Sequence, residues 1–356
     1  MAHIKLYRER LKKNYDELKK ILEREKIEWG IVTKLLCGNE KFLEEVINLG
    51  NLELHDSRIT NLKRIKKINN EIQTVYIKPP AKRYVKSIVE FADVSLNTEL
   101  ETILLLNEEA RRQSKVHKII IMIELGDLRE GILGSELENF YSKIFELKNI
   151  EIVGLGSNFN CLNGVMPSQD KLIQLSLYKS LLEARFNKSI PFVSGGSTVV
   201  LPLIRKKTVP KSINHFRIGE ALYFGKDLMS GNTFSNMRDD VFELNAQIIE
   251  LMKKPMTPFG EFGENPSGDM YEPSEDEVVS ESYRAIIDVG LLDVNPSFIF
   301  PHDEAIKIIG ASSDMIVLDL GNNKKKYSVG DDLKFNLKYM GALSLINSKY
   351  IDKTVS

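Results

Sequence analysis

In roughly the first two thirds of the chain, short β-rich apolar runs alternate with longer amphipathic stretches. The runs recur at intervals of about 20 to 40 residues, which leaves room for one helix and two loops between them. One stretch between runs, residues 39–50, has apolar residues at three-and-four spacing and Gly50 placed to end a helix. This repeat predicts an N-terminal (βα)8 TIM-like barrel. The eight runs lie near residues 29–34, 52–56, 74–78, 92–96, 118–125, 150–156, 191–196 and 215–225.

The pattern changes after residue 228. A run at residues 241–254 that fits either a strand or a helix is followed by a Pro/Gly-rich segment and then by strand-like runs separated by turn signals. We therefore expect an α/β chain with a barrel over residues 1–228 and a C-terminal β-rich domain over residues 229–356. The acidic stretch from Glu261 to Glu281 fits either a solvated loop or an active-site rim that attracts cations.

Charge and composition exclude several classes of partner. The 356 residues include 49 Lys+Arg and 50 Asp+Glu, so nothing in the net charge of −1 favours nucleic acid or an anionic membrane. No apolar run approaches the roughly 20 residues that cross a bilayer, and the N-terminus lacks an export signal. Cys37 and Cys161 support neither a disulfide framework nor a cysteine-rich zinc site. We expect a soluble cytoplasmic protein that binds no metal ion, nucleic acid or membrane.

Lys34 is the first candidate for chemistry. It closes the first β-rich run, at the end of the strand where barrel enzymes place their catalytic groups. Desolvation at a barrel mouth favours the neutral amine, which can form a Schiff base with an aldehyde cofactor. The alternative is a lysine that extends to the surface with no chemical role.

Two glycine-containing loops follow the seventh and eighth runs, where barrels often bind phosphate. Ser197 and Thr198 end the first loop, and Gly219 begins the second, just after Arg217. Such turns are common in barrels, so each loop alone is a weak signal. Together with Lys34, they describe a cofactor that carries both an aldehyde and a phosphate.

Two further polar residues follow the fifth and sixth runs. Arg129 can clamp a carboxylate with two hydrogen bonds, or it can form a surface ion pair with Asp127 or Glu130. Asn158 is either a turn residue or a contact to a ligand.

The segments VTKLLCGN, ELGDLREGI, GLGSNFNC, SGGST, FRIGEALYFG, GASSDM and INSKYIDK, in this order, resemble the alanine racemase family of pyridoxal-phosphate enzymes. The resemblance covers nearly the whole chain and is stronger to the alanine/ornithine racemase branch. It implies that Lys34 holds pyridoxal 5'-phosphate and acts as acid and base at Cα. It also implies that Arg217 contacts the ring nitrogen, and that Arg129 lies near the ring hydroxyl and the substrate carboxylate. The remaining implied cofactor-binding residues are Asn158 near the ring hydroxyl, and Ser197, Thr198, Gly219, Glu220 and Tyr350 at the phosphate.

The chain departs from the family at the second base, which in alanine racemases is a tyrosine of the partner subunit. The corresponding stretch here reads GLLDVN, and Leu291 cannot transfer a proton. Another residue must then serve the opposite face of Cα, or Lys34 or a water must serve both faces. The candidates are Asp293, which we favour, and Tyr271, Tyr283, Cys161 and His302.

The resemblance implies an amino-acid racemase that works as a head-to-tail homodimer, in which the C-terminal domain completes the partner's active site. Ornithine is the preferred substrate, with lysine, arginine, alanine and serine open. Acidic side chains could neutralise the distal ammonium of ornithine. A decarboxylase or a D-amino-acid lyase of the same fold, a non-catalytic pyridoxal-phosphate protein and a barrel for another phosphate ligand are the alternatives. The acidic candidates are Asp127, Glu130, Asp269, Glu272 and Asp293.

Overall fold

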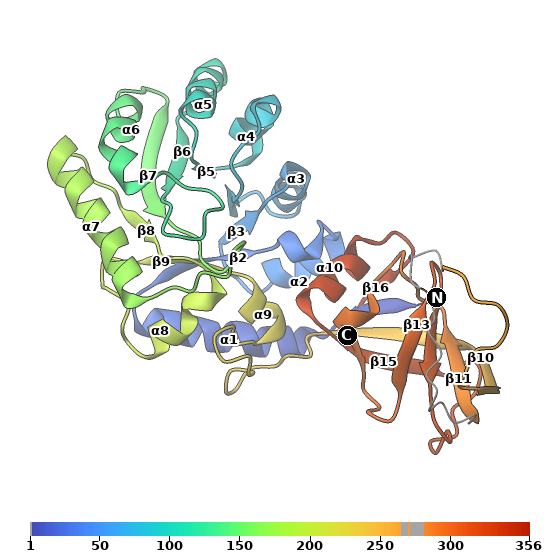
Figure 1. The fold of residues 1–356 in the computed structure, drawn as a ribbon. Coiled ribbons are helices and arrows are strands. Elements are labelled where there is room, and N and C mark those ends of the chain that lie inside the picture. Colours follow the sequence, from blue (N-terminus) through green and yellow to red (C-terminus); the bar gives the residue numbers. More distant parts are fainter. Residues whose placement is uncertain (1, 265–269, 271–280) are drawn as a thin grey trace. The chain divides into compact units, whose positions relative to one another are not determined.

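The computed structural model describes residues 2–264, 270 and 281–356 (Figure 1). The chain forms two compact units, one of Leu6–Val241 with Val355–Ser356, the other of Met1–Lys5 with Phe242–Thr354. The second unit thus begins later than residue 229. The reason is that the segment before Phe242 is bonded within the barrel unit, where Asn14 Nδ2 donates to the carbonyl of Arg238 over 2.7 Å.

The first unit is a closed parallel barrel, as the alternating pattern predicts. Each β-rich run contains one strand, and β2 pairs with both β3 and β9 to close the ring. The eighth run is a strand only at its start, because residues after Gly219 turn into a short helix. The strands are β2 (Glu28–Val32), β3 (Glu53–Asp56), β4 (Gln73–Tyr76), β5 (Val94–Asn97), β6 (His117–Met122), β7 (Ile150–Gly156), β8 (Phe192–Ser194) and β9 (His215–Ile218).

Helices connect the barrel strands, and Figure 1 shows α3 to α7 outside them. Side-chain caps fix two of the helix starts: Asn39 accepts from the N–H of Phe42 over 3.1 Å, and Ser168 accepts from that of Lys171 over 3.3 Å. The helices of this unit are α1 (Arg8–Arg24), α2 (Glu40–Ile47), α3 (Ile59–Ile68), α4 (Val85–Phe91), α5 (Leu100–Arg112), α6 (Leu137–Ile144), α7 (Gln169–Phe186), α8 (Leu201–Arg205) and α9 (Glu220–Phe224).

The second unit is an antiparallel sheet, in the order β12-β15-β10-β11-β14-β13, and the run at residues 241–254 is its long strand β10. The N-terminal strand β1 pairs with β10 and β16, although the sequence pattern did not predict a strand there. Helix α10 was also not predicted. The elements are β1 (His3–Leu6), β10 (Phe242–Pro255), β11 (Glu281–Ile287), β12 (Ile299–Pro301), β13 (Lys307–Ala311), β14 (Ile316–Asp319), β15 (Asp332–Leu337), α10 (Tyr339–Asn347) and β16 (Asp352–Val355).

The fold is therefore an N-terminal barrel of eight parallel strands with helices, followed by an antiparallel β-rich domain. Across the described residues, no helix combines the length and the apolar character needed to cross a membrane. Most of the acidic stretch between Glu261 and Glu281 lies outside the described residues, as do Asp269, Tyr271 and Glu272.

Candidate active site

Lys34 begins a tight 3-10 turn, Lys34–Leu36, directly after β2 at the carboxyl end of the barrel strands. The residue before it is fixed to β3, because Thr33 donates its N–H to the carbonyl of His55 over 2.8 Å and its hydroxyl to Asp56 over 2.8 Å. The turn closes with Cys37 in the left-handed conformation, at a φ of 49°. The backbone that carries the lysine is thus held on both sides.

The amine of Lys34 makes no hydrogen bond or ion pair with any residue that the structure describes, and the side chain is exposed in the single chain. The desolvation expected from the sequence is therefore not present at this position. Glu220 lies near enough to respond to the charge of Lys34: burial raises the pKa of this carboxyl, and the lysine opposes the rise. A primary amine with no partner at a barrel mouth suits covalent attachment of an aldehyde.

Arg217 lies on β9, the neighbour of β2, and is paired in register with Gly30. Its guanidinium is buried and crosses to the ends of β7 and β8, where Nη2 donates to the carbonyl of Ser157 and to Oδ1 of Asn158, both over 2.7 Å. Nη1 donates to Ser194. The N–H on Nε has no acceptor among the described residues, so it remains for a ligand.

Asn158 links Arg217 to the loop that follows β6. Its amide oxygen accepts from Arg217, and its amide nitrogen donates to Glu130, which forms a two-point ion pair with Arg129. The structure thus realises the ion pair between Arg129 and Glu130 that the sequence left as an alternative. A substrate carboxylate would compete with Glu130 for the guanidinium.

Asp127 holds the loop after β7 rather than facing a substrate. Its buried carboxylate accepts from the backbone N–H groups of Cys161, Leu162, Asn163 and Val165 over 2.9 to 3.3 Å. Burial would raise its pKa, but these donors outweigh burial and lower it. Both oxygens of Asp127 are therefore already occupied by this loop, and the neutralisation of a distal ammonium by its charge stays a prediction.

The two loops expected to hold phosphate are joined by one hydrogen bond. Thr198 Oγ1 accepts from the N–H of Ala221 over 3.1 Å, so the loop after β8 meets the start of α9. Ser197 is half-buried and directly precedes Thr198, while Gly219 and Glu220 directly precede Ala221. The barrel therefore brings Ser197, Thr198, Gly219 and Glu220 into neighbouring loops at the end of the barrel where Lys34 lies.

The remaining predicted site residues belong to the second unit. Tyr350 is 73% exposed. Asp293 is buried, and its Oδ1 accepts the hydroxyl of Ser348 over 2.6 Å. To act as a base, this carboxyl would have to become accessible to a substrate.

Sequence reasoning missed three polar residues at the opposite end of the barrel, of which two are buried histidines and one is a half-buried glutamate. Glu53 Oε1 lies 2.5 Å from His55 Nε2 and 2.8 Å from His215 Nε2. We call these three residues the Glu53 cluster. The sequence did contain a hint, because both histidines are polar residues inside apolar strand runs. Their proximity could not be predicted, because only closure of the barrel brings β3 and β9 to either side of β2.

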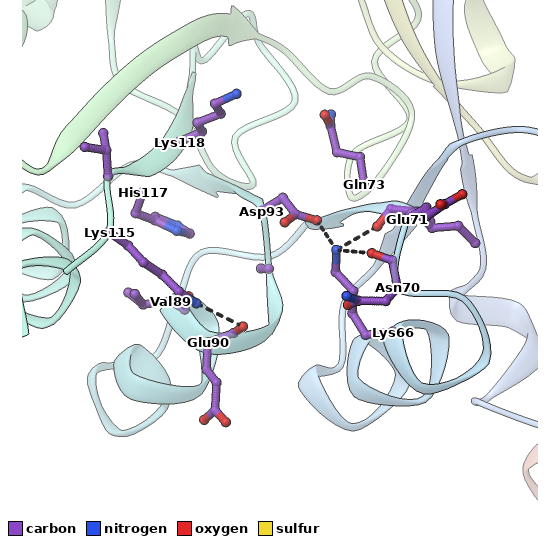
Figure 2. Close-up of a pocket in the computed structure, with 13 residues that line it drawn as sticks. Lys66, Asn70, Glu71, Gln73, Val89, Glu90, Asp93, Lys115, His117 and Lys118 are labelled. Carbon is purple, nitrogen blue, oxygen red and sulfur yellow. Dashed lines mark hydrogen bonds and ion pairs between the residues drawn. The ribbon is translucent and has the colours of Figure 1, made fainter. Parts of the chain in front are cut away.

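A pocket of about 510 Å³ lies at the amino-terminal ends of β4, β5 and β6, whereas Lys34 follows the carboxyl end of β2. Figure 2 shows the residues that line this pocket. Lys66 is engaged there, because its Nζ lies 2.7 Å from Asp93 and 2.8 Å from the carbonyl of Ile72. Barrel enzymes place their chemistry at the carboxyl ends of the strands. We therefore assign the candidate active site to Lys34 and Arg217, not to this pocket.

Comparison with known proteins agrees with this geometry. The family described as "Alanine racemase, N-terminal domain" matches residues 7–227. An ornithine racemase of Acetoanaerobium sticklandii is 36% identical over 97% of this chain and 96% of its own, and a lysine racemase of Thermotoga maritima is 30% identical over 96% of each. The structure of an alanine racemase from Bartonella henselae with covalently bound pyridoxal phosphate superposes with a TM-score of 0.75 at 17% identity, covering 100% of this chain and 99% of that one.

The fold and the site define a barrel with an exposed, unpaired lysine and a buried arginine at the carboxyl end of its strands. The chain belongs to the alanine racemase family, whose members bind pyridoxal phosphate, and it is a racemase, that is, an isomerase. The donor set fits this cofactor: an unpaired amine suits its aldehyde, the remaining N–H of Arg217 suits its ring nitrogen, and the joined loops suit its phosphate.

Proposed function

We propose that this racemase uses pyridoxal 5'-phosphate held by Lys34 to interconvert L- and D-ornithine. The observation that carries the cofactor assignment is the placement of Lys34 in the turn after β2 and of Arg217 on the neighbouring strand β9, with the lysine amine unpaired and the guanidinium buried. Bound pyridoxal phosphate withdraws electrons from Cα of an attached amino acid and so makes its proton acidic.

The residues of the chain would then divide the work. Lys34 takes and returns the proton on one face of Cα. Arg217 donates a hydrogen bond to the ring nitrogen and, because a guanidinium does not give up its proton, leaves that nitrogen unprotonated. This favours prompt return of the proton to Cα. Arg129 binds the substrate carboxylate by exchanging its ion pair with Glu130. Ser197, Thr198, the backbone at Gly219 and Glu220, and Tyr350 hold the phosphate, and Asn158 contacts the ring hydroxyl.

The second face of Cα needs another proton carrier, and we propose that Asp293 of a partner subunit supplies it. In this proposal two chains form a head-to-tail homodimer, and each C-terminal domain completes the other chain's barrel mouth. Sedimentation combined with an activity assay tests it: the dimer should carry all the activity, and an active monomer would refute it.

Ornithine is proposed over lysine because the chain is 36% identical to an ornithine racemase and 30% identical to a lysine racemase over nearly the same length. The test is a comparison of kcat/KM for L-ornithine, L-lysine, L-arginine, L-alanine and L-serine with the purified holoenzyme. Ornithine should exceed every other substrate by about tenfold or more, the effect of one methylene in a fitted pocket. A higher value for lysine would transfer the proposal to that substrate.

A further inference from the structure

The Glu53 cluster joins a carboxylate whose side chain is 19% exposed to two buried histidines, and the proposed reaction does not use it. Oε1 of Glu53 contacts both imidazoles, its Oε2 accepts from Gln73 over 2.9 Å, and the side chains of His55 and His215 are 0% and 3% exposed. The cluster can form because β2 has Gly30 between the two histidine-bearing strands. A Cβ at Gly30 would lie 2.1 Å from His55 Nε2 and 2.7 Å from Glu53 Oε1.

From this cluster a chain of hydrogen bonds leads to Arg217. His215 Nδ1 lies 2.7 Å from Ser194 Oγ, and the same hydroxyl oxygen accepts from Arg217 Nη1. Because an arginine can only donate, the proton of Ser194 is directed to His215 Nδ1. His215 then carries its proton on Nε2 and donates it to Glu53. Each group in this chain of hydrogen bonds thus has a consistent role as donor or acceptor. The chain leads from Glu53, at the amino-terminal end of the barrel strands, to Arg217 in the candidate active site.

The carboxylate of Glu53 is the acceptor at the end of this chain of hydrogen bonds. Burial would raise the pKa of Glu53, but the charge interactions and hydrogen bonds with His215 and His55 outweigh burial and hold it well below its usual range, so the carboxylate is ionised. Burial lowers the pKa of His55, which keeps that imidazole neutral. Burial also lowers the pKa of Arg217 to about 10, and the negative charge of Glu53 is among those that oppose this loss.

Glu53, His55 and His215 could also be the ligands of a metal ion, because each offers one ligand atom and these atoms lie within 4.8 Å of one another. The two contacts of Glu53 Oε1, at 2.5 and 2.8 Å, are nevertheless hydrogen-bond distances. Two ligands on one tetrahedral zinc ion, each about 2.0 to 2.1 Å from the metal, would be roughly 3.3 Å apart. The geometry favours protons over a metal between these atoms.

We infer, resting on the proposed function, that Glu53 is a positioning residue for Arg217, acting through His215 and Ser194 to hold the guanidinium oriented toward the cofactor ring. The relay consists of Glu53, His215, Ser194 and Arg217. It connects the amino-terminal end of the barrel strands to Arg217, whose guanidinium would contact the ring nitrogen.

The variants Glu53→Gln and Ser194→Ala break the relay at two points. A matched control is His117→Gln, because His117 is another buried barrel histidine bonded to a serine, Ser95 Oγ, over 2.8 Å, with no link to Arg217. The readouts are the visible absorbance spectrum of the pyridoxal-phosphate-loaded proteins between pH 6 and 10, and the separate values of kcat and KM.

Both relay variants should shift the pH dependence of the bound cofactor's spectrum by about one pH unit. They should also lower kcat about tenfold with KM changed by less than about twofold, as outer partners of a liganding group do. His117→Gln should leave the spectrum and both constants as in the wild type. Relay variants that behave like His117→Gln would overturn the inference.

A second measurement uses the wild-type protein without cofactor, so it does not depend on the stability of a variant. Nitrogen-15 NMR of labelled histidines at pH 7.5 should show His215 neutral with its proton on Nε2. A protonated His215, a proton on Nδ1, or stoichiometric zinc in the purified protein would overturn the relay. If the holoenzyme racemises no amino acid, the proposed function fails, while the spectra and the NMR still decide the role of Glu53.

Discussion

Thr33, the residue directly before Lys34, donates its hydroxyl proton to the buried carboxylate of Asp56 over 2.8 Å. Asp56 also accepts from the N–H of Arg58 over 2.9 Å and from Asn61 Nδ2 over 3.0 Å. The end of β3 therefore fixes the turn that presents the lysine. This places an ionisable group, itself 0% exposed, one hydrogen bond away from Thr33, the residue that precedes the proposed catalytic lysine.

Asp56 should make the stability of the barrel depend on pH. Burial raises the pKa of this carboxyl to about 6, above its value in the unfolded chain, although its hydrogen bonds oppose the rise. Its contribution to stability is therefore complete below about pH 4 and is lost as the pH rises through 6. The loss amounts to about 3 kcal/mol. Urea unfolding at pH 4.5 and 7.5 should show about 2 kcal/mol of this loss in the wild type beyond any change in Asp56→Asn, and parallel profiles would contradict it.

Asp127 should stabilise the loop at residues 161–165. Asp127→Ala leaves four backbone N–H donors without their acceptor, so the free energy of unfolding should fall by about 3 kcal/mol. Asp127→Asn keeps one acceptor oxygen and should lose less. In a Cys37→Ser background, a thiol reagent should modify Cys161 faster in Asp127→Ala than in the parent. Equal rates and equal stabilities would show that the loop is held by other contacts.

Gly131 allows the loop with Arg129 and Glu130 to pass against the end of β6. Its φ is +146°, and an added Cβ would lie 2.4 Å from the backbone nitrogen of Glu124. Gly131→Ala should therefore lower the free energy of unfolding by more than about 3 kcal/mol. The control is Gly50→Ala, where φ is +86° but no atom lies within 4 Å, so only the strain of about 1 kcal/mol should remain. Similar losses in the two variants would contradict the proposed clash.

The barrel could be predicted from the sequence because its strands are buried on both faces and stand out as short apolar runs between amphipathic helices. Strand β1 escaped prediction because residues 3–6 pair with β10 and β16 at the far end of the chain. The strand β10 was ambiguous because its first half is almost fully buried and its second half is largely exposed, which removes a clear period of two.

The position of Lys34 at a strand end could be predicted, but the contacts among the other polar residues of the barrel could not. Neither the bond from Arg217 to Asn158 nor the contact of Glu53 with His215 can be derived from spacing, since 59 and 162 residues separate the members of these pairs. Their proximity depends on which strands become neighbours when the barrel closes. The resemblance to a known family supplied the role of Arg217, and it gave no information on Glu53.

Lys34 should be the attachment point of the cofactor. Lys34→Ala should lose the visible absorbance of bound pyridoxal phosphate and lower activity by more than about 1,000-fold, because the acid and base on one face is also removed. Lys34→Arg keeps the positive charge but cannot form the covalent bond, and it should behave like Lys34→Ala. Borohydride reduction of the wild type followed by peptide mass spectrometry should place the cofactor on Lys34. Label on another lysine would refute the assignment.

The most direct test of the whole account is proton NMR of the pyridoxal-phosphate-loaded protein with L-ornithine in deuterated water, with optical rotation followed in parallel. The account predicts that the Cα–H signal disappears while the rotation decays to zero, because protons are exchanged on both faces of Cα. Exchange with full retention of rotation would mean that only one face is served. A Cα–H signal that persists unchanged would contradict ornithine racemisation by this protein.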